Sequence, residues 1–319
     1  MDRWQVVCVD GMYSSKKEVR SGVPQGSIMG PVLFLVFIND LPDFLPSCDI
    51  FLFADDTTLS VKSYDFGDLG RLSQGALSLA TEWFSSNGLS MNISKTQKVI
   101  FSLRPIGETE ELKGEAKFLG ICLDSGLTFG AHALNLASKL SRNTFALRTL
   151  ADFLSADMLR IVYFSLIESH LKYCIVVWGN CSLRDSIFRI QRRAVRIVAG
   201  LGYYACCKKA FKELKLMTFP ALYIWENLCF LHMNREMFKT QADVHGINTR
   251  YKSLLRKDFR RLTRSQRHFP WISIEFYNKL PNHIVSLDIK KFKLILKKIF
   301  IDNPIYSIEE YYESVKILS

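Results

Sequence analysis

Two adjacent aspartates interrupt an apolar stretch in FLFADDTTLSV, residues 51–61. Residues 48–53 and 57–61 are rich in strand-forming side chains, so the stretch predicts a β-hairpin with Asp55 and Asp56 at its tip. Neighbouring carboxylates repel each other and are costly to bury. They therefore indicate either a hydrated turn or a site that collects cations.

Paired carboxylates have a specific use in phosphate chemistry. They can hold two divalent cations about 3.5–4 Å apart, which clamp the attacking and leaving oxygens of a phosphoryl transfer. Magnesium suits such a site because it accepts one or two carboxylates together with phosphates and waters. Phe53 and Leu59 are expected to anchor the strands, and Ala54 leaves space beside the pair.

The elements around this hairpin indicate how it is positioned. The stretch SGVPQGSIMGP, residues 21–31, has loop composition, and the continuously apolar residues 32–39 predict a buried helix. Residues 5–10 and 17–20 predict an earlier hairpin. An amphipathic helix is expected over 69–84, with Asn87-Gly88 as its C-terminal stop.

The pattern changes near residues 125–131. Strands are expected before it, at 97–103 and 117–123, and helices dominate after it. The fold class is therefore α+β, with a mixed first part and an all-helical remainder. The expected helices cover residues 133–152, 156–168, 183–199, 207–214, 220–238, 251–267 and 288–299.

Charge is distributed unevenly along the chain. Residues 1–130 carry 11 Lys+Arg and 16 Asp+Glu, a net of −5, whereas residues 131–319 carry 31 and 15, a net of +16. A basic part joined to an acidic part suggests that the basic part binds a polyanion electrostatically and that the acidic part contains a cation-binding site. A solvated basic surface would give the same totals, so charge alone leaves nucleic-acid binding open.

Two expected helices place arginines on one face. At 100° per residue, Arg189, Arg192, Arg193 and Arg196 fall within one third of the circumference, opposite an apolar face. In the helix expected over 251–267, the shared basic face is Arg256, Lys257, Arg260, Arg264 and Arg267. Solvated faces look similar, but phosphate-backbone contacts with little sequence preference are favoured.

Compartment and membrane signals are few. The longest apolar run, residues 28–38, is too short to span a bilayer, and no signal peptide is visible. The eight cysteines show no disulfide spacing. A reducing compartment, the cytoplasm or the nucleus, is therefore expected, without membrane partners.

The segment FADD at 53–56, preceded by SGVPQGSIMGPVLFLVFINDLP at 21–42, resembles the palm of non-LTR retrotransposon reverse transcriptases, the LINE and Jockey-like group. The resemblance implies that Asp55 and Asp56 are two of three metal-binding aspartates for two Mg²⁺ ions. It also implies that the loop and the hairpin shape the nucleotide and template site. The residues concerned are Pro24, Gln25, Gly26, Phe53 and Ala54.

Further segments extend the resemblance. WFSSNGLSMNISKTQKVIF, residues 83–101, is similar to the segment after the catalytic hairpin, which implies that Lys95 steadies or protonates departing pyrophosphate. The interpretation of Lys95 as a solvated lysine in a turn is equally well supported by the sequence. KFLGICLD, residues 117–124, looks like the hairpin that supports the primer end, through Phe118, Leu119 and Gly120.

The implied organisation is a partial palm over 1–130, a helical thumb-like region over 131–200 and a basic helical region over 201–319. The implied reaction is RNA-directed DNA synthesis from a primer 3′-hydroxyl, with an RNA template, a DNA primer and deoxynucleotides. The family's third aspartate lies upstream, and neither Asp2 nor Asp10 is a credible replacement. The expectation is an N-terminally truncated, C-terminal part of the polymerase region.

Three hypotheses about function therefore stay open. The leading one is a reverse transcriptase fragment whose own activity is in question, because a missing ligand weakens metal binding and alignment. The second is a non-catalytic nucleic-acid-binding relic or scaffold. The third is an unrelated metal-dependent phosphotransferase, which the spacing of the remaining carboxylates does not support. Oligomeric state is not indicated.

Overall fold

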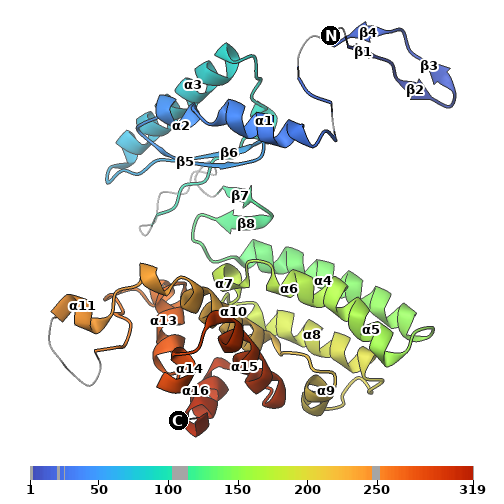
Figure 1. Ribbon diagram of the computed structural model, residues 1–319, viewed down its shortest axis with the longest axis vertical. Helices are drawn as coiled ribbons and strands as arrows, with labels where there is room; N and C mark the ends of the chain where they lie inside the picture. Colours follow the sequence, from blue (N-terminus) through green and yellow to red (C-terminus); the bar gives the residue numbers. More distant parts are fainter. Residues whose placement is uncertain (1–2, 20–21, 25, 103–113, 246–251, 319) are drawn as a thin grey trace. The chain divides into compact units, whose positions relative to one another are not determined.

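The computed structural model describes residues 3–19, 22–24, 26–102, 114–245 and 252–318. The chain divides into two units, Met1–Thr96 (unit 1) and Gln97–Ser319 (unit 2), each with its own hydrophobic cluster. Unit 1 combines strand pairs with helices, whereas in unit 2 one strand pair precedes a helical body (Figure 1). The mixture is α+β, as predicted.

The first strands of unit 1 form the hairpin predicted around Gly11. Antiparallel pairing joins Val9 to Met12, and Asp10 and Gly11 between them have φ of 50° and 80°. Positive φ at both central residues is the geometry of a type I′ turn. The four strands are β1 (Trp4–Gln5), β2 (Cys8–Val9), β3 (Met12–Tyr13) and β4 (Lys17–Glu18), and β1 pairs with β4.

The other elements of unit 1 share a small core. Two helices precede the aspartate hairpin, and a long helix and a short 3₁₀ turn follow it. They are α1 (Met29–Ile38), α2 (Leu41–Phe44), β5 (Asp49–Phe53), β6 (Asp56–Ser60), α3 (Phe66–Ser86) and η1 (Ile93–Lys95). The fully buried apolar residues of this core are Ile38, Leu41, Leu45, Ala80 and Trp83.

Helix α1 differs from the buried helix predicted over 32–39. Only Gly30 and Ile38 are buried, and Val36 is 71% exposed. Phe34 and Ile38 belong to the unit 1 core, which takes up one side of the helix. Continuous apolarity therefore predicted the helix correctly and its burial wrongly, because the core of unit 1 covers only that side.

Helix α3 has the ends that its sequence predicts. The Asp65 carboxylate accepts a hydrogen bond from the Asp68 backbone N–H at 3.0 Å, which caps the N-terminus. At the other end Asn87 is the C-cap residue, and Gly88 follows with φ 70°. The helix is longer than the expected 69–84, and Trp83 near its C-terminal end anchors it in the unit 1 core.

Unit 2 begins with one strand pair and continues as helices. These elements are β7 (Glu115–Phe118), β8 (Ile121–Asp124), α4 (Gly130–Ala151), α5 (Ala156–Tyr163), the π-helix η3 (Phe164–Glu168), α6 (Ser169–Lys172), α7 (Ile175–Trp178), α8 (Arg184–Val198), α9 (Lys208–Glu213), α10 (Phe219–Met233), η4 (Arg235–Met237), α11 (Gln241–His245), α12 (Thr263–Arg267), α13 (Trp271–Asn278), α14 (Asn282–Val285), α15 (Ile289–Asp302) and α16 (Ile308–Leu318).

A buried glutamine fixes α8 in this body. The Gln191 amide nitrogen donates to the Tyr163 hydroxyl at 2.8 Å and to the Met217 carbonyl at 3.0 Å, and its amide oxygen accepts from the Phe219 N–H at 2.7 Å. A buried amide with its hydrogen bonds made specifies one arrangement of its neighbours. Gln191 therefore sets the position of α8 against α5 and α10.

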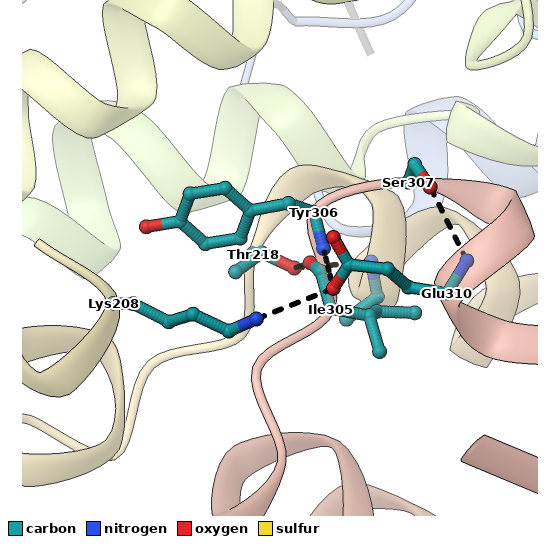
Figure 2. Close-up of polar contacts among 7 residues, drawn as sticks. Lys208, Thr218, Ile305, Tyr306, Ser307 and Glu310 are labelled. Atoms are coloured by element: carbon teal, nitrogen blue, oxygen red, sulfur yellow. Dashed lines mark hydrogen bonds and ion pairs between the residues drawn. The ribbon is translucent and has the colours of Figure 1, made fainter. Parts of the chain in front are cut away.

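The last helix is tied to the same body through its N-terminal end (Figure 2). The Glu310 N–H donates to Ser307 Oγ at 3.2 Å, and the Glu310 carboxylate accepts from the Tyr306 N–H at 3.1 Å and pairs with Lys208 at 3.3 Å. Ser307 caps the helix as in a capping box, but the Glu310 carboxylate accepts from the residue before the N-cap and also forms an ion pair. Thr218 Oγ1 also donates to the Ile305 carbonyl, so the segment before α16 is held against the start of α10.

Two sequence predictions in unit 2 are wrong. Residues 97–102 form no strand, and the helix expected over 251–267 is present only as α12. The stretch before α12 is tied down by side chains instead, since Asn278 bonds both the N–H and the carbonyl of Leu255, at 2.9 and 2.8 Å. Spacing alone could not reveal these partners.

Two further findings concern the chain as a whole. No helix in the described part of the chain combines the length and the apolar character needed to cross a membrane. All eight cysteines are free thiols. The three-part division at residues 130 and 200 stays a prediction, and the contact pattern divides the chain at 96 and 97.

Candidate nucleotidyl-transfer site and nucleic-acid interface

The hairpin β5–β6 carries the two aspartates as predicted. Phe53 pairs with Asp56, which leaves Ala54 and Asp55 as a two-residue turn. Of the two, Ala54 has positive φ, 50°, as at the first position of a type II′ turn. Non-glycine residues rarely adopt this conformation, so the backbone is strained beside the carboxylates.

Strand register separates the two faces of the hairpin. Ile50, Leu52 and Leu59 pack against the unit 1 core. Since residues on one strand alternate between faces, Phe53 and its partner Asp56 lie on the opposite face. Phe53 is 63% exposed there, so the prediction that it anchors the hairpin is wrong, whereas Leu59 does pack against the core. Asp56 is also exposed. The core thus presents both carboxylates to solvent from a fixed platform.

The loop before α1 packs on the first turn of that helix. The Ser27 N–H donates to the Pro24 carbonyl at 3.1 Å, and Gly26 has φ 85°, as the third residue of a type II turn requires. A Cβ on Gly30 would come within 3.1 Å of Val23, so glycine permits this approach. Pro24 and Gly26 are exposed, and Gln25 lies outside the described residues.

Figure 1 shows where the N-terminal end of α1 and the turn of the β5–β6 hairpin lie in unit 1. The chain reverses between α1 and β5 through α2. In Figure 1 the N-terminal end of α1 and the β5–β6 turn lie toward the same side of this unit.

The hairpin offers a partial ligand set for a divalent cation. Asp55 and Asp56 supply hard oxygen ligands of the kind that magnesium prefers. The described residues contain no group of three or more His, Cys, Asp and Glu side chains that could hold a metal ion. The metal-binding role of the two carboxylates therefore stays a prediction.

Lys95 ends the short helix η1 and is exposed. Asn92 caps this turn, since its Oδ1 accepts from the Lys95 N–H at 3.3 Å. The cap fixes the backbone and leaves the ammonium group in solvent. The pyrophosphate role of Lys95 stays a prediction.

The predicted primer-support hairpin is present as β7–β8. Phe118 pairs with Ile121 across Leu119 and Gly120, whose φ values of 45° and 85° give a type I′ turn. The Tyr173 hydroxyl donates to the Leu119 carbonyl at 2.5 Å. This contact attaches the turn to the segment that follows α6, and the primer-support role stays a prediction.

Helix α8 has the amphipathic arrangement that its sequence predicts, but its arginines differ in environment. Arg189 is exposed. Arg192 lies over the Phe188 ring at 5.0 Å, and its buried Nε has no hydrogen-bond partner among the described residues. Arg193 lies over Tyr203 at 5.9 Å, and Arg196 Nε donates to the Ala205 carbonyl at 2.7 Å.

The second predicted basic face does not form. Arg256, Lys257 and Arg260 precede α12, and Arg264 and Arg267 lie within it, so the expectation of one helical face is wrong. Lys257 pairs with Glu275 at 3.0 Å and lies over Trp271 at 3.7 Å. Arg260 donates to the Ser265 carbonyl at 3.2 Å. Contact of Arg256, Arg260 and Arg264 with a nucleic-acid backbone stays a prediction.

One basic residue near α8, Arg148, was not predicted from the sequence to contact nucleic acid. Arg148 lies on α4 and shares a hollow with Arg193 and Arg196. Its sequence neighbours are those of an ordinary amphipathic helix, so no local signal distinguishes it. The packing of α4 on α8, which brings these arginines together, could not be predicted from the sequence.

Comparisons with known proteins agree with the motifs. Residues 3–123 match the family model for reverse transcriptase (RNA-dependent DNA polymerase). The chain is 32% identical over 239 residues to the "Probable RNA-directed DNA polymerase from transposon BS" of Drosophila melanogaster, covering 68% of this chain and 26% of that protein. It is 29% identical over 231 residues to the "RNA-directed DNA polymerase from mobile element jockey" of the same organism, covering 66% and 25%.

A more distant relative extends the set. The chain is 26% identical over 218 residues to the "Retrovirus-related Pol polyprotein from type-1 retrotransposable element R1" of Bradysia coprophila, covering 63% of this chain and 22% of that protein. No solved structure matches the chain. The chain spans about a quarter of the length of the curated relatives named above. Its sequence motifs and these relatives agree, and the chain belongs to the reverse transcriptases of the non-LTR, jockey-like retrotransposons.

Proposed function

We propose that the chain contributes the metal-binding hairpin of an RNA-directed DNA polymerase, which extends a DNA primer on an RNA template. The observation that supports this most directly is the exposed β5–β6 tip, where Asp55 and Asp56 stand on a strained turn backed by the unit 1 core. The tip lies within the segment that matches the reverse transcriptase family.

In the proposed reaction the primer 3′-hydroxyl gives its proton to water and its oxygen bonds to the α-phosphorus of a deoxynucleoside triphosphate, while the bond from that phosphorus to the pyrophosphate breaks. Reverse transcriptases generally use divalent metal ions, and Mg²⁺ held by Asp55 and Asp56 would offset negative charge on the phosphates. The role of the hairpin is to hold two carboxylates in a fixed, exposed position. The loop at Pro24–Gly26 shapes the nucleotide and template side, together with Phe53 and Ala54. Lys95 is proposed to donate a proton to the leaving pyrophosphate.

The test is primer extension by the full chain on an RNA template with Mg²⁺, comparing Asp55→Asn with Asp49→Asn. Asp49 lies at the far end of the same strand pair, opposite Ser60, and its exposed ion pair with Lys62 contributes little stability. Loss of one metal-binding carboxylate should reduce extension by at least about a hundredfold, whereas Asp49→Asn should leave it within about twofold. Equal effects of the two changes would refute the metal role of the tip.

A second candidate is nucleic-acid binding without polymerisation. It is favoured by the arginines of unit 2, which α4 and α8 bring together on a different unit from the hairpin. In this case RNA and DNA bind to the chain, no primer is extended, and Asp55→Asn changes neither result. Binding and extension assays on the same preparation separate the two candidates.

A further inference from the structure

A basic hollow of about 320 Å³ opens in unit 2 between α4, α8 and the loop that follows α8. Its volume lies at the lower end of the range of ligand pockets. We call it the arginine hollow. It is lined by Arg148, Arg193, Arg196, Ile197, Leu201 and Tyr203. None of these lining residues is acidic, so the three positive charges face an open space without a negative partner in the lining.

Two of the three guanidinium groups are held in place by the protein. Arg196 is fixed by its hydrogen bond to the Ala205 carbonyl at 2.7 Å, and Arg193 lies over the Tyr203 ring at 5.9 Å. Arg148 is exposed and has no hydrogen bond or ion pair with any described residue. An anion that enters the hollow therefore meets two preset donors and one free donor, and it would offset their mutual repulsion.

The edge of the hollow carries two exposed aromatic rings. Tyr203 is 59% exposed and Tyr204 is 93% exposed, and their rings meet edge to face with centroids 4.8 Å apart. Rings exposed beside arginines are the usual platform for unpaired nucleobases. A duplex keeps its bases stacked inside the helix, so its bases would not reach these rings.

We propose that the arginine hollow binds a phosphodiester group of single-stranded nucleic acid, with a neighbouring base stacked on Tyr203 or Tyr204. This deepens the nucleic-acid role proposed above and rests on it. The phosphate accepts hydrogen bonds from Arg148 and the two fixed arginines. Because these contacts address backbone and base faces, binding shows weak sequence preference and strong salt dependence.

The test measures binding of a fluorescein-labelled 12-mer of oligouridine to the full chain by fluorescence anisotropy at several salt concentrations. Arg148→Gln is compared with Arg142→Gln, an exposed arginine six residues earlier on α4, about 240° around the helix and outside the hollow. Arg148→Gln should weaken binding about fivefold to tenfold and reduce the salt slope by about 0.7. Equal losses in the two variants would overturn the proposal.

The base-stacking step has its own variants. Tyr203→Phe keeps the ring and should bind within about twofold of the unchanged chain, whereas Tyr203→Leu should lose about fivefold or more. Equal binding of the Phe and Leu variants would refute the stacking of a nucleobase on Tyr203. Inorganic phosphate is included as a competitor, and displacement of the 12-mer at millimolar phosphate under constant ionic strength would show that free phosphate is the ligand instead.

These outcomes are independent of polymerase activity. A chain that extends no primer but shows the Arg148-dependent binding supports the hollow and shows that this chain does not polymerise by itself. A chain that extends primers and binds the 12-mer equally well with Arg148→Gln refutes the hollow and leaves the proposed polymerase intact.

Discussion

The conformation of Ala54 determines how the hairpin presents its two carboxylates. An alanine at φ 50° is less stable than a glycine there, because its Cβ crowds the backbone by about 1–2 kcal/mol. Glycine loses about 0.5–1 kcal/mol more conformational entropy on folding. Ala54→Gly is therefore expected to raise the free energy of unfolding of unit 1 by roughly 0–1 kcal/mol. The unfolding transition of unit 1 in differential scanning calorimetry measures this change.

The matched control is Ala76→Gly in the interior of α3. Ala76 is buried within a regular helix, so glycine should lower stability there by about 1 kcal/mol or more. A loss of similar size at Ala54 would show that its backbone is not strained. A stabilised Ala54→Gly variant that extends primers more slowly would indicate that the strain serves the site.

At the scale of elements, Asp124 joins β8 to α4. Partial burial by itself would raise the pKa of its carboxyl, but hydrogen bonds from Thr128, Phe129 and Gly126 outweigh burial and lower the pKa. An amide in its place cannot accept all of these bonds. Asp124→Asn is therefore expected to lower the free energy of unfolding of unit 2 at pH 7 by about 1–3 kcal/mol.

The direction of the pH dependence follows from the lowered pKa. The stabilisation by Asp124 is fully present above its unfolded-state pKa of about 3.9, and it is lost as the pH falls through the lower folded-state pKa. Urea titrations from pH 7 to pH 2.5 should show a shallower acid loss in Asp124→Asn. Asp152→Asn, an exposed change at the C-terminal end of α4, should alter stability by less than about 0.5 kcal/mol. A similar loss in both variants would contradict the anchoring role.

The elements also show which features the sequence could predict. The hairpins around Gly11 and Asp55 and the helix end at Asn87 were predictable, because turn chemistry and caps act within a few residues. The hairpin around Gly120 was expected only from the family resemblance, since the residue pattern alone predicted one strand over 117–123. The exposure of α1 and the loss of helix before α12 were not predictable. Both depend on partners distant in the chain, such as the Asn278 side chain that bonds Leu255.

The residues of the candidate sites also differ in whether the sequence could predict them. Asp55 and Asp56 were identified from local sequence, since a carboxylate pair in an apolar hairpin is unusual. Arg148 was not identified, because its partners Arg193 and Arg196 lie more than forty residues away and meet it only through helix packing. Arg192 is packed between Phe188 of its own helix and Tyr306, and the contact with Tyr306, more than a hundred residues later, could not be predicted from the local sequence.

At the scale of the whole molecule, the two units have separate cores and opposite charge. Unit 1 carries 7 Lys+Arg and 11 Asp+Glu, whereas unit 2 carries 35 and 20. Trp83 is buried in the smaller core and Trp178 in the larger. Two cores predict two unfolding transitions, with unit 1 the less stable because it buries less apolar surface.

The two tryptophans test this division. Trp83→Ala is expected to lower the stability of the first transition by about 3–5 kcal/mol and to leave the second in place, and Trp178→Ala should do the reverse. Differential scanning calorimetry of the full chain resolves the two transitions. A single transition that moves in both variants would mean that the units unfold as one.

The helix cap at Ser307 and Glu310 has a consequence for gene copies that acquire early stop codons. Tyr311 and Val315 lie in the unit 2 core, and the segment before them is fixed to Thr218. A stop codon before Ile305 would thus remove side chains from the unit 2 core. This position lies nearly two hundred residues after the end of the segment that matches the reverse transcriptase family. Coding changes far from any catalytic motif would then destabilise unit 2.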